Sequence, residues 1–124
     1  MGLFTKDRTQ ELLSLDTALN DRIIRGEALE AFEEYYAEDV VMQENDAEPT
    51  VGKASNRKRE QDFFSAVTEF RGASVLAQGG GGDTTFSQSE MDFTHRDWGD
   101  RKYRQVAVRT WKDDKIVREV FYYG

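Results

Sequence analysis

The stretch that decides the fold of this chain runs from Tyr35 to Lys53 and reads YYAEDVVMQENDAEPTVGK. At Val40 the spacing of the apolar residues changes from the helical period of about 3.6 to a period of about 2, which is typical of a strand. A turn at Glu48-Pro49 and a second turn at Gly52 separate that strand from the next helical segment. The stretch therefore predicts the end of a helix, a strand over residues 40–46, and then another helix.

This strand places a carboxylate on an apolar face. Val40, Met42 and Glu44 point to the same side, because successive side chains of a strand alternate between its two faces. Burying an unpaired carboxylate among apolar side chains costs several kcal/mol. Glu44 is therefore the first candidate functional residue of the chain.

Three helices are predicted in the first 70 residues. Apolar residues three and four positions apart indicate a helix over residues 7–24, which a glycine ends. A second helix over residues 27–37 follows so closely that the two should pack against each other. Ser55 or Asn56 would cap a third helix, which is expected to run to Phe70.

The second half of the chain has the pattern of strands throughout. Strands are expected over residues 72–78, 84–97, 102–112 and 115–123. The run Gly79–Gly82 precedes a strand and no helix, so we expect a flexible hairpin tip there and no phosphate-binding loop. Helices followed by an antiparallel meander are the order of an α+β fold. Residues 1–124 are expected to form a single domain.

The composition excludes several classes of function. The 124 residues carry a formal net charge of −7, whereas a nucleic-acid partner requires a concentrated basic face. The absence of cysteine excludes disulfides, thiolate chemistry and a zinc ribbon. Without a signal peptide or an apolar run of about 18 residues, no membrane partner is expected, and the predicted location is the cytoplasm. One histidine and scattered carboxylates give no metal-ligand spacing, so we expect neither a metal nor a cofactor.

The order of these segments resembles a known superfamily. Two helices followed by YAEDVVMQEN, a Gly-Lys pair, a helix and a meander are similar to the NTF2-like (cystatin-like) superfamily, and more narrowly to its SnoaL-like proteins, relatives of ketosteroid isomerase. The closing segment Thr110–Tyr123, TWKDDKIVREVFYY, is similar to their last hairpin. The resemblance covers about residues 8–123. It implies a cone of three N-terminal helices packed on a curved, mainly antiparallel sheet, with a cavity between them and a homodimer formed through the sheet.

The resemblance also suggests what Glu44 does. It places Glu44 where ketosteroid isomerase carries its general base, an aspartate. The alternative for Glu44 is a residue at the rim of the pocket, or a partner of an arginine or a tyrosine. Ala107 and Leu19 stand where that enzyme has the protonated aspartate and the tyrosine of its oxyanion hole. Because each such donor is worth about 3 kcal/mol in the transition state, steroid isomerisation is not expected.

Glu119 is the second candidate catalytic residue. The resemblance places it on the cavity side of the last strand, where it and Glu44 could form a carboxylate pair whose pKa values are pushed apart. The alternative for Glu119 is a structural ion pair with Arg104 or Arg109.

His95 is the third candidate catalytic residue. It shares a strand face with Met91 and Phe93 and could relay a proton, because the ordinary pKa of histidine lies close to neutral pH. The alternative is a surface or merely hydrogen-bonded side chain ahead of a turn.

Two main hypotheses of function follow for the expected pocket, which would bind a small organic molecule, cyclic or carbonyl-containing. A third possibility is that the aromatic side chains fill the cavity and the chain is a purely structural dimer. In the first, the chain is a cofactor-free isomerase or cyclase, in which Glu44 takes a proton next to a carbonyl and Glu119, Gln105 or His95 donates to the developing oxyanion. In the second, the chain is a non-catalytic ligand-binding or dimerisation module whose carboxylates are held in ion pairs. The side chains expected to contact the ligand are Tyr36, Met42, Gln105, Trp111 and Phe121.

Overall fold

The structure is a computed structural model that describes residues 8–124. Its elements are, in chain order, α1 (Thr9–Ile24), α2 (Ala28–Tyr35), β1 (Tyr36–Glu44), β2 (Thr50–Val51), α3 (Lys53–Ala66), β3 (Val67–Gly81), β4 (Thr84–His95), β5 (Gly99–Lys112) and β6 (Lys115–Tyr122). Within the described part of the chain, no helix has the length and apolar character needed to span a bilayer.

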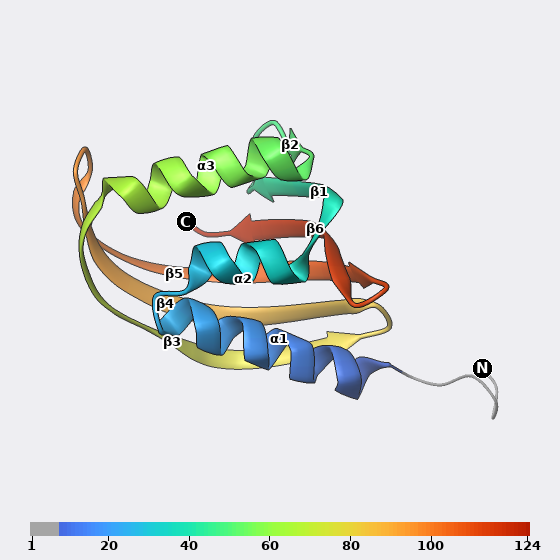
Figure 1. Cartoon of the computed structure of the whole chain (residues 1–124). Helices are drawn as coiled ribbons and strands as arrows, with labels where there is room; N and C mark the ends of the chain where they lie inside the picture. The colour runs from blue at the N-terminus through green and yellow to red at the C-terminus, as the bar shows by residue number, and fades with distance from the viewer. Residues whose placement is uncertain (1–7) are drawn as a thin grey trace, which may run out of the picture.

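The helices and the sheet form two layers. Figure 1 shows α1, α2 and α3 on the same side of a sheet that curls around them toward α3. The strands lie in the order β2-β1-β6-β5-β4-β3. Neighbouring strands are antiparallel except β1 and β6, which are parallel. The expected α+β fold, three helices packed on a curved and mainly antiparallel sheet, is confirmed.

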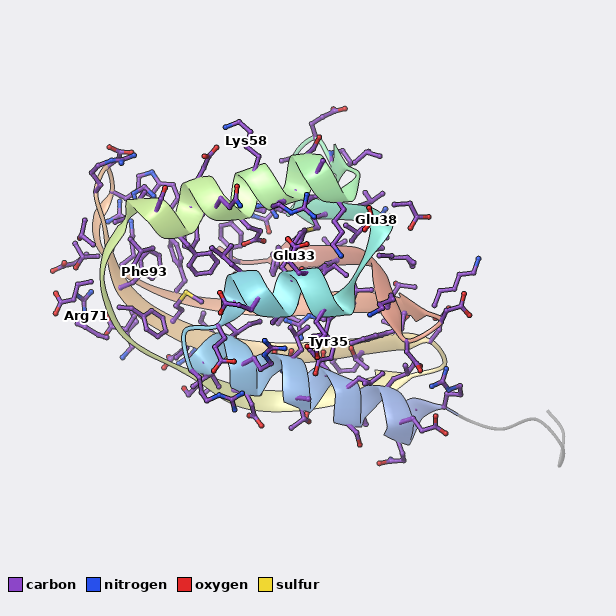
Figure 2. The ribbon with its side chains drawn as sticks, in the orientation of Figure 1. Glu33, Tyr35, Glu38, Lys58, Arg71 and Phe93 are labelled. Atoms are coloured by element: carbon purple, nitrogen blue, oxygen red, sulfur yellow. The ribbon has the colours of Figure 1, made fainter. Side chains whose placement is uncertain are left out.

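The curvature of the sheet has a visible cause in β3. Its pairing with β4 shifts register between Val67 and Glu69, between Phe70 and Gly72, and again between Val75 and Ala77. Each irregularity adds a residue to one strand, and such bulges bend a strand and increase its twist. The bent sheet has a concave side, and Phe93 of β4 is fully buried on it, whereas Lys58 points outward from α3 (Figure 2).

The hydrophobic core is formed by side chains of α1, α2, β1, β5 and β6. The rings of Phe32 and Tyr36 stack there with their centroids 4.8 Å apart. Trp111 and Met42 belong to this core as well, each with less than a twentieth of its surface exposed. The buried cluster consists of Leu12, Leu19, Ala31, Phe32, Tyr36, Val40, Met42, Trp111 and Ile116.

The predicted limits of the third helix were wrong at both ends. α3 begins at Lys53 after Gly52, which has a φ of 95°. Asn56 lies inside the helix, where its Nδ2 donates to the carbonyl oxygens of Val40, Thr50 and Gly52 at 3.3, 3.0 and 2.9 Å. Those bonds hold the short strand β2, which the sequence did not predict, against β1. The helix ends at Ala66, because the residues after it pair with β4 as the start of β3.

The glycine run is also different from the prediction. Gly79, Gly80 and Gly81 continue β3 and pair with β4, so only Gly82 and the next residue form the turn. A side chain at Gly79 would meet the ring of Phe86 at 2.9 Å, so the absence of one lets that ring lie across the strand. The glycines therefore permit a close approach between two strands.

The face of the sheet away from the helices carries exposed apolar side chains. Phe86 and Tyr122 are 46% and 51% exposed. Their neighbours Thr85 and Phe121 face the helices, so strand alternation places Phe86 and Tyr122 on the opposite face. This face is available for the expected dimer contact.

Candidate functional site

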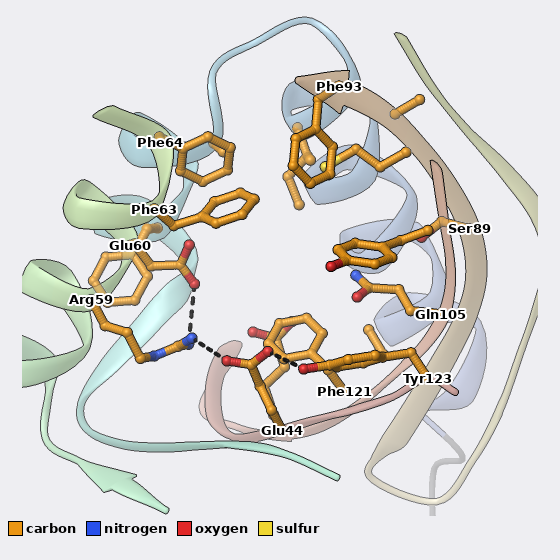
Figure 3. A pocket seen from close by; sticks show the side chains of 18 of the residues that line it. Glu44, Arg59, Glu60, Phe63, Phe64, Ser89, Phe93, Gln105, Phe121 and Tyr123 are labelled. Carbon is orange, nitrogen blue, oxygen red and sulfur yellow. Dashed lines mark hydrogen bonds and ion pairs between the residues drawn. The ribbon is translucent and has the colours of Figure 1, made fainter. Parts of the chain in front are cut away.

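A cavity of about 480 Å³ lies between the helices and the concave face of the sheet. All three helices and strands β1, β3, β4, β5 and β6 contribute to its wall. Figure 3 shows side chains from α3 facing side chains from the sheet across the open space. Its aromatic lining consists of Phe32, Tyr36, Phe63, Phe64, Phe93, Trp98, Tyr103, Phe121 and Tyr123. A pocket of this size and lining suits a small, largely apolar organic molecule.

Glu44 lies at the edge of this cavity and is engaged by two partners. Its side chain is 45% exposed. Arg59 Nη1 donates to Glu44 Oε2 at 3.1 Å, and the hydroxyl of Tyr123 donates to Glu44 Oε1 at 2.7 Å. The bond to Glu44, together with partial burial, raises the pKa of Tyr123 to about 12. Both oxygens of the expected base are thus used to hold other side chains.

Glu60 is a cavity carboxyl that the sequence interpretation missed. It extends from α3 toward the sheet, as Figure 3 shows, and its side chain is only 18% exposed. Its one contact with a cation is long, 3.4 Å from Arg59 Nη2 to Glu60 Oε1. Burial raises the pKa of Glu60 from the ordinary 4.5 to about 7, with the charges of Glu119 and Glu44 adding to the effect and that of Arg59 opposing it. This carboxyl changes its charge close to neutral pH.

A signal for Glu60 was present in the sequence. It precedes Phe63 and Phe64 by three and four residues, which places all three on one face of a helix. That face is otherwise apolar. Glu60 is therefore a carboxylate on an apolar face, which is the feature that identified Glu44 as a candidate. The neighbouring Arg57-Lys58-Arg59 run has the composition of a solvated helix turn, which conceals this pattern.

A buried ion-pair network forms the floor of the cavity. Arg109 Nε donates to Glu119 Oε2 at 2.7 Å, and Arg109 Nη1 donates to Asp16 Oδ1 at 2.6 Å. Burial alone would lower the pKa of Arg109, but the charges of Glu119, Tyr36 and Asp16 raise it above its ordinary value. Arg109, Asp16 and Glu119 are each at most 3% exposed, so this arginine neutralises carboxylates that water cannot reach.

Further polar groups complete this floor. The hydroxyl of Tyr36 donates to Glu119 Oε1 at 2.7 Å, and burial together with the charge of Glu119 raises the pKa of Tyr36 well above 10. Arg109 Nη1 also donates to Asn20 Oδ1 at 2.9 Å. Thr85 Oγ1 donates to Asp16 Oδ1 at 3.0 Å. Glu119 therefore has the ion pair with Arg109 that was one of its two predicted alternatives.

Two side chains of β5 face the cavity with free hydrogen-bonding groups. Gln105 and Tyr103 both line it, and Figure 3 shows Gln105 on the wall opposite Glu60. Within residues 8–124, neither the amide of Gln105 nor the hydroxyl of Tyr103 has a hydrogen-bond partner. They can therefore donate to a bound molecule without breaking an existing bond.

The structure brings together most of the predicted site residues. Met42 and Trp111 do not line the cavity, because they pack in the core, where Trp111 Nε1 donates to Thr85 Oγ1 at 2.9 Å. Leu19 and Ala107, which stand at the expected oxyanion-hole positions, both line it and supply no donor. In the described residues, no group of three or more His, Cys, Asp or Glu is arranged to hold a metal ion. The predicted residues that do line the cavity are Tyr36, Glu44, His95, Gln105, Glu119 and Phe121.

Comparisons with solved structures agree with the fold. A protein from Mesorhizobium loti assigned as a SnoaL-like polyketide cyclase is 25% identical, with a TM-score of 0.79 over 89% of this chain and 97% of its own. An LEH-like epoxide hydrolase of M. tuberculosis is 13% identical, with a TM-score of 0.76 over 94% of this chain and 85% of its own. A Kribbella flavida protein assigned as a ketosteroid isomerase is 18% identical, with a TM-score of 0.74 over 95% of this chain and 81% of its own.

Sequence comparison identifies the family. No curated protein matches the chain. The model of the SnoaL-like domain matches residues 14–123, which is nearly the whole described chain. The predicted order of helices and strands, the NTF2-like fold of its structural neighbours and this match agree, and the chain belongs to the SnoaL-like domain family.

Proposed function

We propose that this chain binds an uncharged, largely apolar organic molecule in the cavity and catalyses proton transfer on it without a cofactor, with Glu60 as the general base. The observation that carries the proposal is a carboxyl with a pKa of about 7, directed into an aromatic cavity and only loosely paired. A base is most effective when its pKa lies near the working pH. The names of the Mesorhizobium loti and Kribbella flavida proteins, a cyclase and an isomerase, support the same class of reaction.

The base role goes to Glu60 in preference to the predicted Glu44 because of their surroundings. Glu44 is nearly half exposed and accepts hydrogen bonds on both oxygens. A proton on either oxygen would weaken its hydrogen bond to Arg59 or Tyr123. We therefore assign Glu44 the role of holding Arg59, which in turn approaches Glu60.

The reaction would use both walls of the cavity. The carboxylate of Glu60 takes a proton from the carbon next to a carbonyl, and the electron pair of that C–H bond moves to the carbonyl oxygen to form an enolate. The amide of Gln105, on the opposite wall, can donate to this developing oxyanion (Figure 3). Return of the proton to another carbon completes an isomerisation. In a cyclisation, the enolate carbon attacks a second carbonyl, the electron pair of that C=O bond moves to its oxygen, and this alkoxide takes the proton back from Glu60.

The charges of the lining disfavour an anionic ligand. Acidic side chains outnumber basic ones around the cavity, so an anionic molecule would be repelled. The acidic members are Glu44, Glu60, Asp62, Asp97 and Glu119, and the basic members are Arg59, Arg96 and Arg109.

The test uses nitrobenzisoxazole, a neutral aromatic compound that reports on any base in an apolar cavity. A base removes its C–H proton while the N–O bond breaks, and the product is a coloured phenolate. We expect catalysis that increases as pH rises through about 7, and a loss of roughly 100-fold or more in the Glu60→Gln variant. Glu44→Gln, which removes the same charge at the edge of the cavity, should retain the rate within about tenfold. Equal rates for wild type and Glu60→Gln would refute the proposal.

A second candidate function is ligand binding without catalysis. The observation that favours it is that Glu44 and Glu119, the predicted catalytic pair, are both held in ion pairs with arginines. In that case the cavity would still bind nitrobenzisoxazole, and its saturable binding would be accompanied by no rate that depends on Glu60.

A further inference from the structure

His95 is the only histidine of the chain, and it is enclosed at the end of β4. Its ring is 5% exposed and stacks on the indole of Trp98, with centroids 3.7 Å apart and planes at 8°. The ring of Phe63 from α3 lies 5.9 Å away at an angle of 36°. These two contacts fix the orientation of the imidazole against the cavity that it lines.

A backbone hydrogen bond determines which nitrogen of the neutral ring carries the proton. The N–H of Asp97 donates to His95 Nδ1 at 3.1 Å. A nitrogen that accepts a hydrogen bond has its lone pair free and carries no hydrogen, so the neutral ring must carry its proton on Nε2. His95 is therefore an Nε2–H donor.

This donor has no partner within the described chain. Residues 8–124 supply no acceptor for Nε2, and the only polar atoms there that are both enclosed and unpaired are Asn56 Oδ1 and Arg59 Nε. Nε2 is therefore accessible, and the space next to this buried ring is the cavity. An N–H group that is oriented but unpaired at a cavity wall is available for the acceptor atom of a ligand.

We propose that His95 Nε2–H binds an acceptor oxygen, such as a ketone or ester carbonyl, at the end of the cavity lined by Trp98 and Phe63. This goes beyond the proposed function, because it rests on the cavity being a ligand site and does not require Glu60 to act as a base. Of the two roles predicted for His95, it differs from the proton relay and develops the donation to a ligand oxygen, since it needs His95 only to keep its hydrogen.

The separation of His95 and Gln105 along the sheet limits the shape of the ligand. Gln105 pairs with Ser89, and Ser89 precedes His95 by six residues on β4. At about 3.3 Å per residue, the backbone positions of the two residues lie at most about 20 Å apart along the strand. One carbonyl cannot reach both donors, so we infer an elongated molecule with separate oxygen groups toward its two ends.

The first test is nitrogen NMR of the full chain grown on isotope-labelled histidine, in which every signal comes from His95. We expect Nδ1 to resonate as an unprotonated, hydrogen-bonded nitrogen and Nε2 as a protonated one. The probe is para,para′-diacetylbiphenyl, and its control is para,para′-diisopropylbiphenyl, which has a similar shape and no acceptor. The diacetyl compound should shift the Nε2 signal, and the diisopropyl compound should leave it nearly unchanged.

Two variants test the affinity itself. His95→Phe keeps a flat ring beside Trp98 and removes the donor, so its Kd for the diacetyl compound should rise about tenfold while its Kd for the diisopropyl compound stays the same. His95→Gln restores an N–H group and should recover part of the loss. The proposal is overturned by a proton on Nδ1, by wild-type binding of the diacetyl compound that is no tighter than that of the control, or by equal effects of His95→Phe on both. These measurements do not depend on catalysis, so they test His95 even if Glu60 does not act as a base on nitrobenzisoxazole.

Discussion

Replacement of Glu60 by glutamine should make the protein more stable at alkaline pH. Glutamine has the shape of a protonated glutamate but cannot ionise, so the variant keeps the neutral form that burial favours. The wild-type carboxyl must ionise among Phe63, Phe64 and the buried Glu119 once the pH exceeds its pKa of about 7. The difference between the two proteins therefore isolates the free energy of charging this one group.

The direction and the size of the effect follow from the two pKa values. Below pH 4.5, Glu60 is protonated in the folded and unfolded chain alike, so its charge makes no contribution. Between pH 4.5 and about 7 it ionises only in the unfolded chain, and the stability of the wild type therefore falls as pH rises. Above about pH 7 the wild type loses no further stability. At about 1.36 kcal/mol per pKa unit, its total loss of stability is roughly 3 kcal/mol.

The assay is urea unfolding of wild type and Glu60→Gln from pH 4 to pH 8.5, followed by the fluorescence of the two tryptophans. As pH rises through this range, the free energy of unfolding of the variant should increasingly exceed that of the wild type. The final difference should be roughly 3 kcal/mol, with a Tm difference on the order of 10 °C. Glu48→Gln removes the same charge at an exposed turn and should stay within about 0.5 kcal/mol of the wild type at every pH. A constant difference between wild type and Glu60→Gln would show that Glu60 titrates normally and would refute the reasoning.

Two further variants test the floor of the cavity and the outer face of the sheet. Arg109→Met leaves two buried carboxylates without their cation and should cost about 3–5 kcal/mol in urea unfolding, whereas Arg104→Met breaks an exposed ion pair and should cost less than about 1 kcal/mol. Similar losses of stability in the two variants would show that the buried ion pairs of Arg109 do not stabilise the protein as inferred. We also expect the wild type to sediment as a homodimer through the sheet and Phe86→Glu to sediment as a monomer, with Val51→Glu, at an exposed apolar residue of β2, retaining the dimer. A monomeric wild type would disprove the dimer.

Local patterns were sufficient to predict the fold because they are repeated along the chain. The change of period at Val40 and the short connections between the later strands identify the elements without knowledge of their contacts. The strand predicted over residues 40–46 exists, but β1 begins at Tyr36 and ends at Glu44. The boundaries that failed depend on partners distant in sequence. Residues 67–70 continue the apolar spacing of α3, but pairing with β4 draws them into a strand. Gly79 to Gly81 have a turn-like composition, and the same pairing makes them extended.

The site was only partly predictable, for a similar reason. Strand alternation correctly placed Glu44 in line with Val40 and Met42, but alternation says nothing about Arg59, which approaches from another element. The environment of Glu60 depends on how closely the helix lies to the sheet. No sequence spacing encodes that distance, so the more deeply placed of the two carboxyls was the one overlooked.

The central position of β6 has a consequence for how this protein folds. β6 is the last strand in sequence, yet it lies between β1 and β5 and joins the two parts of the sheet. Its register joins residues about 80 positions apart, as between Met42 and Glu119. Contacts of such long range are slow to form, because the intervening chain must first lose the entropy of a large loop. β5 and β6 form a local hairpin that places Arg109 beside Glu119 early. The cavity floor is complete only when β1 pairs with β6 and Tyr36 reaches Glu119, so the binding site should be among the last features to assemble.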